Sequence, residues 1–158
     1  MSDPFRFHQT LQVRFRDIDE MGHAHHTLPL VYIEEARSLY WREVLDRPEL
    51  DFIIGEVGMR YHRRIRYPST VTVAVRTTRL GDRSLGMSYE IRDEAGDLLA
   101  DGWSKQVMYD YAAGRSKQVP QSVRLRVGEY EPEAVEGAAQ PSSAVTPTSA
   151  SPTTAPST

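Results

Sequence analysis

The chain has 158 residues, enough for one domain with a sizeable core but not for two. Its net charge of -3 lacks the basic excess typical of nucleic-acid binders, and no apolar run approaches the roughly 20 residues that a membrane span needs. The absence of cysteine excludes disulfides, a thiolate nucleophile and cysteine-ligated zinc. The N-terminus lacks the plan of a secretory signal, so these features together fit a cytoplasmic protein.

The first predicted element is a strand that starts at Leu11. Apolar residues alternate with polar ones through Leu11, Val13 and Phe15, which is the period of a half-buried strand. A polar segment, residues 17–27, then interrupts the alternation and contains Gly22.

A long helix is predicted to follow from Leu28, with Pro29 in its first turn, where the missing N–H costs little. It should end by Arg47, ahead of Pro48. The residues expected near its buried face are Leu30, Ile33, Tyr40 and Val44, with Ala36 and Arg37 between them.

The rest of the folded part reads mainly as strands. Residues 52–67 are expected to form one long strand, followed by strands over residues 70–80, 85–92 and 98–110, with Gly-containing turn signals after them. Residues 120–127 fit a short helix or an extended segment, and the pattern does not decide between the two.

One helix against an antiparallel sheet is an α+β architecture. Because a single helical layer covers only one face of the sheet, association with a second copy is the simplest way to complete the fold. We place the folded domain at residues 5–130.

The composition then changes to Ala, Pro, Ser and Thr. Residues 134–158 contain no large apolar residue beyond Val135 and Val145. Such a segment buries too little surface to offset its ordering entropy, so we predict a disordered tail, with a linker or regulatory role left open.

Residues 13–41 carry a distinctive combination: Asp17, Asp19 and Gly22 in the spacing Asp-x-Asp-x-x-Gly, then a helix with Glu-Ala-Arg at residues 35–37. This combination resembles the opening motif of the 4-hydroxybenzoyl-CoA thioesterase-like proteins of the hotdog fold. Weaker similarities at residues 61–68, 80–84 and 89–92 extend the resemblance over roughly residues 11–127.

The resemblance implies an antiparallel sheet wrapped around one long central helix, with dimers that join their sheets. It implies an acyl-CoA thioesterase that hydrolyses a thioester to a carboxylic acid and CoA without a cofactor. It also implies a homodimer or homotetramer whose active sites lie at the subunit interface.

Thioester hydrolysis needs an attacking oxygen and a site for the negative charge that develops on the carbonyl oxygen. A carboxylate serves the first need as general base or nucleophile, and unpaired N–H groups at a helix N-terminus serve the second. Asp19 matches the family's catalytic aspartate, although an aspartate there also fits a loop or helix cap. Asp17 is expected to be its structural neighbour.

Gly22 is expected to permit a tight turn that brings amides towards the thioester. The backbone N–H of His26 is the candidate oxyanion donor, and its side chain is a candidate to orient water or the acyl group. The alternative for His26 is a first-turn histidine without a part in catalysis.

Many relatives read Gly-His-x-Asn-Asn where this chain reads GHAHH at residues 22–26. The changes leave the backbone role intact but alter the side-chain surroundings of the substrate, for which His25 is a candidate contact. His23, His25 and His26 beside the two aspartates also suggest zinc ligands. Residues one or two apart rarely converge on a metal, so we predict none.

Arginine suits the phosphates of CoA. Arg63 and Arg64, followed by Arg66, and Arg83 with Ser84 at a turn are candidates for the nucleotide end, although exposed arginines are common. Glu34 or Glu35 on the helix is a minority candidate for a second acid.

Two rivals to the thioesterase hypothesis remain at this point. One is a non-catalytic hotdog module that binds acyl-CoA or an acyl carrier. The other is a metal-dependent hydrolase built on the histidines. The pattern of one chain does not identify the acyl group.

Overall fold

The computed structural model describes residues 3–136. Its elements in chain order are β1 (Phe7–Gln12), a 3-10 turn (Phe15–Asp17), α1 (Leu28–Glu43), β2 (Phe52–Tyr61), β3 (Thr70–Leu80), β4 (Ser84–Arg92), β5 (Leu98–Asp110), β6 (Arg115–Ser116), α2 (Gln121–Tyr130) and α3 (Glu133–Glu136).

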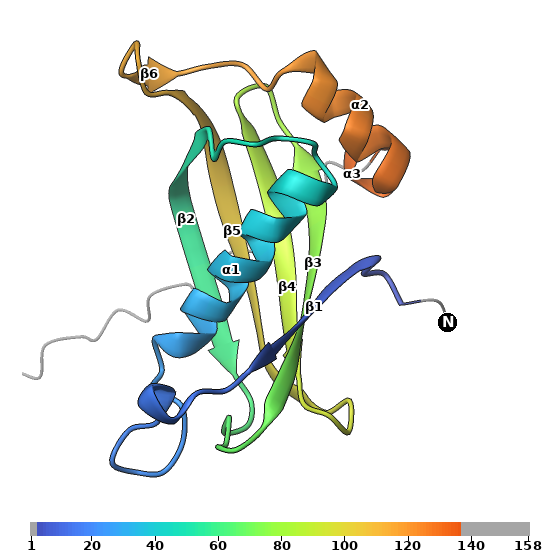
Figure 1. Cartoon of the computed structure of the whole chain (residues 1–158). Helices are drawn as coiled ribbons and strands as arrows, with labels where there is room; N and C mark the ends of the chain where they lie inside the picture. The colour runs from blue at the N-terminus through green and yellow to red at the C-terminus, as the bar shows by residue number, and fades with distance from the viewer. Residues whose placement is uncertain (1–2, 137–158) are drawn as a thin grey trace, which may run out of the picture.

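The strands form one antiparallel sheet in the order β1-β3-β4-β5-β2, with the short β6 paired to β5. α1 lies across one face of this sheet, and β1 and β2 form its two edges (Figure 1). The predicted α+β hotdog architecture, an antiparallel sheet around one central helix, is therefore confirmed.

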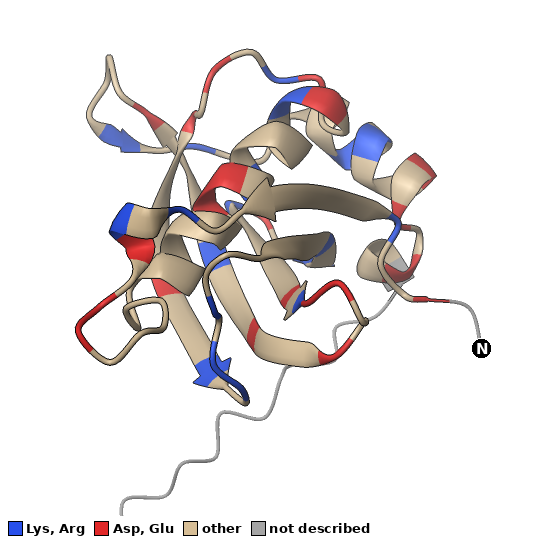
Figure 2. Cartoon of the chain, turned by 60° about the horizontal axis from the view of Figure 1, so that its bottom comes forward, with Lys and Arg blue, Asp and Glu red and all other residues tan. Residues whose placement is uncertain are grey.

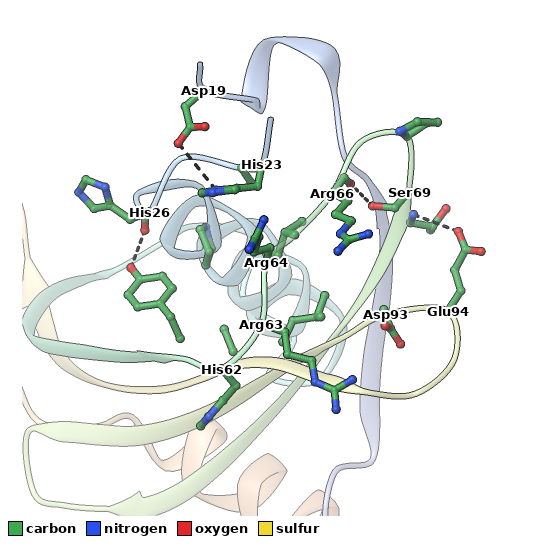
Figure 3. A pocket seen from close by; sticks show the side chains of 18 of the residues that line it. Asp19, His23, His26, His62, Arg63, Arg64, Arg66, Ser69, Asp93 and Glu94 are labelled. Carbon is green, nitrogen blue, oxygen red and sulfur yellow. Dashed lines mark hydrogen bonds and ion pairs between the residues drawn. The ribbon is translucent and has the colours of Figure 1, made fainter. Parts of the chain in front are cut away.

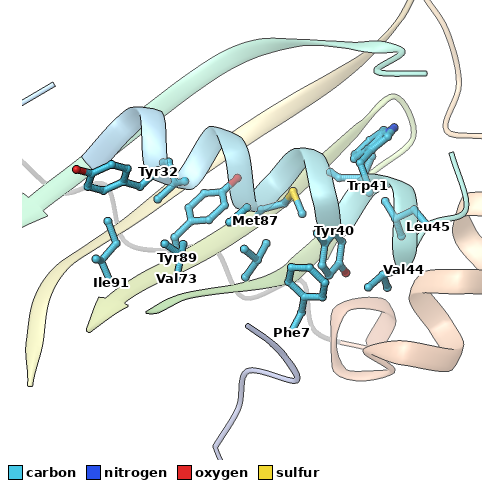
Figure 4. Packing of buried hydrophobic residues seen from close by; sticks show 14 of the residues in the cluster. Phe7, Tyr32, Tyr40, Trp41, Val44, Leu45, Val73, Met87, Tyr89 and Ile91 are labelled. Atoms are coloured by element: carbon cyan, nitrogen blue, oxygen red, sulfur yellow. The ribbon is translucent and has the colours of Figure 1, made fainter. Parts of the chain in front are cut away.

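The core lies between α1 and the sheet. Tyr32, Ile33, Ala36, Tyr40 and Trp41 are almost completely buried on α1, at the three- and four-residue spacing of one helix face. They pack against the inward side chains of the central strands, which include Val73, Met87, Tyr89 and Ile91 (Figure 4). Leu30, predicted in this face, lies in the first turn of α1 and is only partly buried.

The first strand lies earlier than predicted. β1 ends at Gln12, and Phe15 belongs to a 3-10 turn with its side chain 78% exposed. The Asp17 carboxylate accepts a hydrogen bond from the Arg14 N–H at 2.9 Å, which closes this turn. The alternation of polar and apolar residues therefore continues beyond the point where the backbone leaves the sheet.

The predicted strand over residues 52–67 is also too long. β2 ends at Tyr61, opposite Ala100, because the partner strand β5 begins only two residues further on, at Leu98. Residues 62–69 turn back instead towards the start of α1, where Ile65 accepts a hydrogen bond from the Ala24 N–H.

The C-terminal part contains two helices. The undecided residues 120–127 start α2, in which Val123 and Val127 are fully buried at a four-residue spacing. α3 follows with Ala134 buried, so the ordered part continues through residues 134–136, past the predicted boundary. Residues 137–158 of the predicted tail lie outside the described residues. Between residues 3 and 136, no helix is long and apolar enough to cross a membrane.

A buried carboxylate joins these C-terminal helices to the core. Glu131 is 2% exposed, and its Oε2 accepts hydrogen bonds from the Tyr40 hydroxyl, at 2.6 Å, and from the Thr77 N–H. Burial raises the pKa of Glu131 against the opposing effect of these hydrogen bonds and of nearby arginines.

We expect Glu131→Gln to flatten the pH dependence of stability. Because folding raises the pKa of Glu131, the native protein retains a proton that the unfolded chain has released. The wild-type free energy of unfolding therefore falls as pH rises from the ordinary glutamate value through the raised pKa. Gln keeps an acceptor oxygen and removes this titration.

Urea unfolding of both proteins between about pH 4 and 8 measures the difference. Glu129→Gln, an exposed substitution on α2, should retain the wild-type slope. Parallel pH profiles for the wild type and Glu131→Gln would contradict the prediction.

Candidate active site

Asp19 lies at one end of a tight turn that precedes α1. The Asp19 N–H donates to the His23 carbonyl at 3.0 Å, and the Gly22 N–H donates to the Asp19 carbonyl at 3.0 Å. Gly22 has φ of +79°, a conformation that favours glycine. The Met21 N–H donates to Asp19 Oδ1 at 2.9 Å, so backbone contacts within the turn hold the carboxylate.

Asp17 holds the base of the same loop. It is 7% exposed, and its Oδ2 accepts from the Tyr32 hydroxyl of α1 at 2.8 Å as well as from the Arg14 N–H. Its carbonyl accepts from the His25 N–H at 3.0 Å. Burial and then the Asp17 hydrogen bond raise the pKa of Tyr32, which therefore stays a hydrogen-bond donor. Asp17 thus anchors the loop to the helix.

The start of α1 offers an unpaired backbone donor. Within residues 3–136, the His26 N–H donates no hydrogen bond, and the side chain of the N-cap residue Thr27 does not cap the helix. The Tyr61 hydroxyl at the end of β2 donates to the His26 carbonyl (Figure 3). A free N–H at the positive end of a helix dipole favours negative charge beside it.

These groups line a cleft of about 1050 Å³. Asp19, His23 and His26 come from the loop before α1, and the segment after β2 supplies Arg63 and Arg64 (Figure 3). The other polar residues that line the cleft are Tyr61, His62, Arg66, Ser69, Thr70, Asp93 and Glu94. Figure 2 shows basic residues gathered just past the end of β2, on the side of the molecule that contains this cleft.

The arginines of this segment differ in their partners. Arg63 forms an ion pair with Asp97 at 2.5 Å. Arg64 and Arg66 contact no carboxylate among residues 3–136 and leave their guanidinium groups available to a ligand.

The structure brings together only part of the predicted site. Asp19, His26, Arg63 and Arg64 line one cleft, and Gly22 shapes the turn beside it. His25 is exposed, stacks on His26 at 4.1 Å between ring centroids and does not line the cleft.

Arg83 and Ser84 lie elsewhere in the chain. Ser84 starts β4 and Arg83 precedes it, at the opposite end of the sheet, where Leu80 pairs with Leu85, whereas the cleft lies near Thr70 and Asp93. Arg83 donates to the Ser116 carbonyl at 2.9 Å. Within one chain they do not join Asp19.

The cleft residues that the sequence did not predict include one imidazole and two carboxylates: His62, Asp93 and Glu94. The turn that carries Asp93 and Glu94 reaches the cleft through the pairing of β4 with β5 and of β5 with β2, for which the local sequence gives no signal. Glu34 and Glu35 are exposed on α1 and do not line the cleft. Within the described part of the chain, no three His, Asp or Glu side chains are placed to hold a metal ion.

Many solved structures are similar to this chain. A Thermus thermophilus thioesterase solved with coenzyme A and Zn is 30% identical, with a TM-score of 0.76 over 83% of this chain and 98% of its own. A Bacillus stearothermophilus protein described as a predicted thioesterase is 25% identical, with a TM-score of 0.72 over 78% and 94%. A Staphylococcus aureus protein solved in complex with CoA shares the fold at 16% identity, with a TM-score of 0.73 over 80% and 84%.

No curated protein matches the chain. Residues 21–100 match the family model of the Thioesterase superfamily, and this stretch covers half of the chain. It begins in the turn beside Asp19 and ends at Ala100 of β5, the residue that pairs with Tyr61. The chain therefore belongs to the Thioesterase superfamily.

Proposed function

We propose that this protein is an acyl-CoA thioesterase, which hydrolyses a thioester to a free carboxylic acid and CoA. The observation that carries the proposal is a single cleft lined both by Asp19, with its carboxylate held by backbone, and by His26, with an unpaired N–H at the start of a helix. These are the two groups that thioester hydrolysis requires.

Asp19 acts as general base on water or as nucleophile. Its Oδ1 is occupied by the Met21 N–H, which leaves Oδ2 for the reaction. The His26 N–H stabilises the oxyanion, and one such donor contributes about 3–4 kcal/mol to stabilising a transition state.

The arginines of the cleft bind the phosphates of CoA. Arg64 and Arg66 have no carboxylate partner in the described part of the chain, so their guanidinium groups are available to a phosphate. Arg63 exchanges its ion pair with Asp97 for a contact with a phosphate. The Thermus relative solved with coenzyme A supports this ligand class.

The protein works as a homodimer or homotetramer with its site at the subunit interface. β2 is an edge strand whose exposed Ile54, Val57 and Tyr61 pair with the inward-facing residues of β5, so they lie on the face of the sheet that α1 covers. An unpaired edge with exposed apolar side chains favours association. Tyr61 also lines the cleft, so the edge and the site adjoin. Arg83, Ser84 and His25 would join the site only through a second copy or a bound substrate.

We expect Asp19→Asn to lower kcat/KM for acyl-CoA substrates by about a hundredfold or more, since general-base catalysis contributes typically 10²–10⁴-fold. A panel of acyl-CoA thioesters measures the effect. Glu20→Gln removes the same charge from an exposed neighbour outside the cleft and should retain wild-type turnover.

Unchanged hydrolysis by Asp19→Asn would reject the mechanism. Tight binding of acyl-CoA by the wild type without turnover of any thioester would instead favour a non-catalytic binding module. Hydrolysis abolished by a chelator would favour the metal-dependent reading.

Arg64→Gln should raise KM for CoA thioesters about tenfold with little change in kcat, because a hydrogen bond to a charged group contributes about 1.5–3 kcal/mol. The same substitution should have less effect on a short thioester without the nucleotide. Arg79→Gln, which removes an exposed arginine at the far end of β3, is the matched control. Equal effects of the two variants would argue against phosphate binding by Arg64.

Val57→Glu should shift the protein towards the monomer and lower its activity, because it places a charge among the exposed apolar side chains of the edge strand β2. Light scattering coupled to size-exclusion chromatography measures the mass. Leu125→Glu, at a more exposed apolar position on α2, should leave the mass unchanged. A wild type that is monomeric at assay concentration and fully active would contradict the interface proposal.

A further inference from the structure

We propose that His23 is a positioning residue that keeps the reactive oxygen of Asp19 directed into the cleft and accepts the proton that Asp19 removes from water. The proposal rests on the proposed hydrolysis with Asp19 as general base, and it assigns a role to a histidine of the loop that otherwise has none.

The turn holds the two side chains together. His23 Nδ1 lies 3.8 Å from Asp19 Oδ2, while the other carboxylate oxygen accepts from the Met21 N–H (Figure 3). The two side chains are 26% and 25% exposed, so each is partly shielded from water. Within residues 3–136, the His23 imidazole has no other hydrogen-bond or ion-pair partner.

The backbone of His23 is fixed from both sides. The Asp19 N–H donates to its carbonyl, and His23 forms a β-bridge with Arg66 in the segment after β2. The next residue, Ala24, donates its N–H to the Ile65 carbonyl at 2.8 Å. The imidazole is thus held opposite Asp19 by two chain segments, and a closure of less than 1 Å brings the pair into hydrogen-bond range, as is common when a catalytic site binds substrate.

General-base catalysis by Asp19 requires a group that accepts the proton from Asp19 afterwards. A water oxygen forms a bond to the thioester carbonyl carbon while Asp19 Oδ2 takes one of its protons. The tetrahedral intermediate then collapses, the carbon–sulfur bond breaks, and sulfur leaves with the electron pair as the CoA thiolate. Asp19 must lose its proton before the next turnover.

Substrate in the cleft limits the access of bulk water to Asp19, so a local acceptor is needed. His23 Nδ1 takes the proton from Asp19 Oδ2 and releases it to solvent when the products leave. Imidazole is the side chain whose ordinary titration lies between about pH 5 and 8, which suits it to this exchange.

Other charged groups share the cleft with His23. His26 comes from its own loop, Arg64 and Arg66 from the segment after β2, and Asp93 and Glu94 from the turn between β4 and β5. A pH profile must therefore separate His23 from His26, the other imidazole of the loop, and from His62, whose imidazole lines the cleft from the segment after β2.

The test compares His23→Gln, His23→Ala and the wild type in kcat and KM between about pH 5 and 9. We expect kcat of His23→Gln to fall about tenfold or more with KM changed less than threefold, and the limb of the profile due to imidazole to disappear. Added free imidazole should restore part of the kcat of His23→Ala. His8→Gln, which replaces a histidine paired with Asp3 outside the cleft, is the control for loss of an imidazole.

Wild-type kcat and an unchanged pH profile in His23→Gln, with Asp19→Asn inactive, would overturn this inference and leave the proposed function standing. A lower kcat with the imidazole limb retained and no rescue of His23→Ala would also overturn it, because a purely structural role predicts that result. A wild type that hydrolyses no thioester would reject the proposed function and this inference together. Thermal unfolding of each variant identifies any loss due to misfolding.

Discussion

The burial of one face of α1 against the sheet is the constraint on which the rest of the molecule depends. Ile33, Ala36, Tyr40 and Trp41 are at most 1% exposed, and they leave α1 one orientation in which its aromatic side chains are removed from water. This packing also sets the position of the helix N-terminus. The polar loop that carries Asp19 must therefore reach the sheet at the end where β2 stops.

A buried hydrogen bond links the packed face of α1 to the loop that carries Asp19. The Tyr32 hydroxyl belongs to the packed face of α1 and donates to Asp17, whose carboxylate also closes the turn after β1. Asp19 follows two residues later, in a turn that backbone hydrogen bonds close. Gly22 adopts a φ of +79° in this turn. Strand, loop and helix are thereby joined by hydrogen bonds around the carboxylate, which would give the proposed general base the preorganisation that a catalytic group requires.

Prediction from the sequence succeeded where the pattern is local. The alternation over residues 70–80 and 98–110 gave β3 and β5 with their observed bounds, because both strands bury alternate side chains along most of their length. It was wrong at Phe15 and after Tyr61. At Phe15 the backbone turns because the Arg14 N–H donates a hydrogen bond to the Asp17 carboxylate, and at Tyr61 the partner strand ends. The periodicity of the segment itself indicates neither event.

The sequence by itself determined the α+β class, the turn around Gly22 and the placement of Asp19 ahead of a long helix, since each depends on residues close together in the chain. The hotdog architecture followed from the resemblance carried by residues 13–41, because its strand order depends on pairing between distant segments. Only the tertiary structure decided which arginines accompany Asp19. Arg64 and Arg66 reach the cleft because residues 62–69 fold back onto the loop before α1, and Asp93 and Glu94 because of the strand register. Arg83, of the same residue type and also at a turn, lies at the other end of the sheet, because antiparallel pairing sends successive turns to opposite ends.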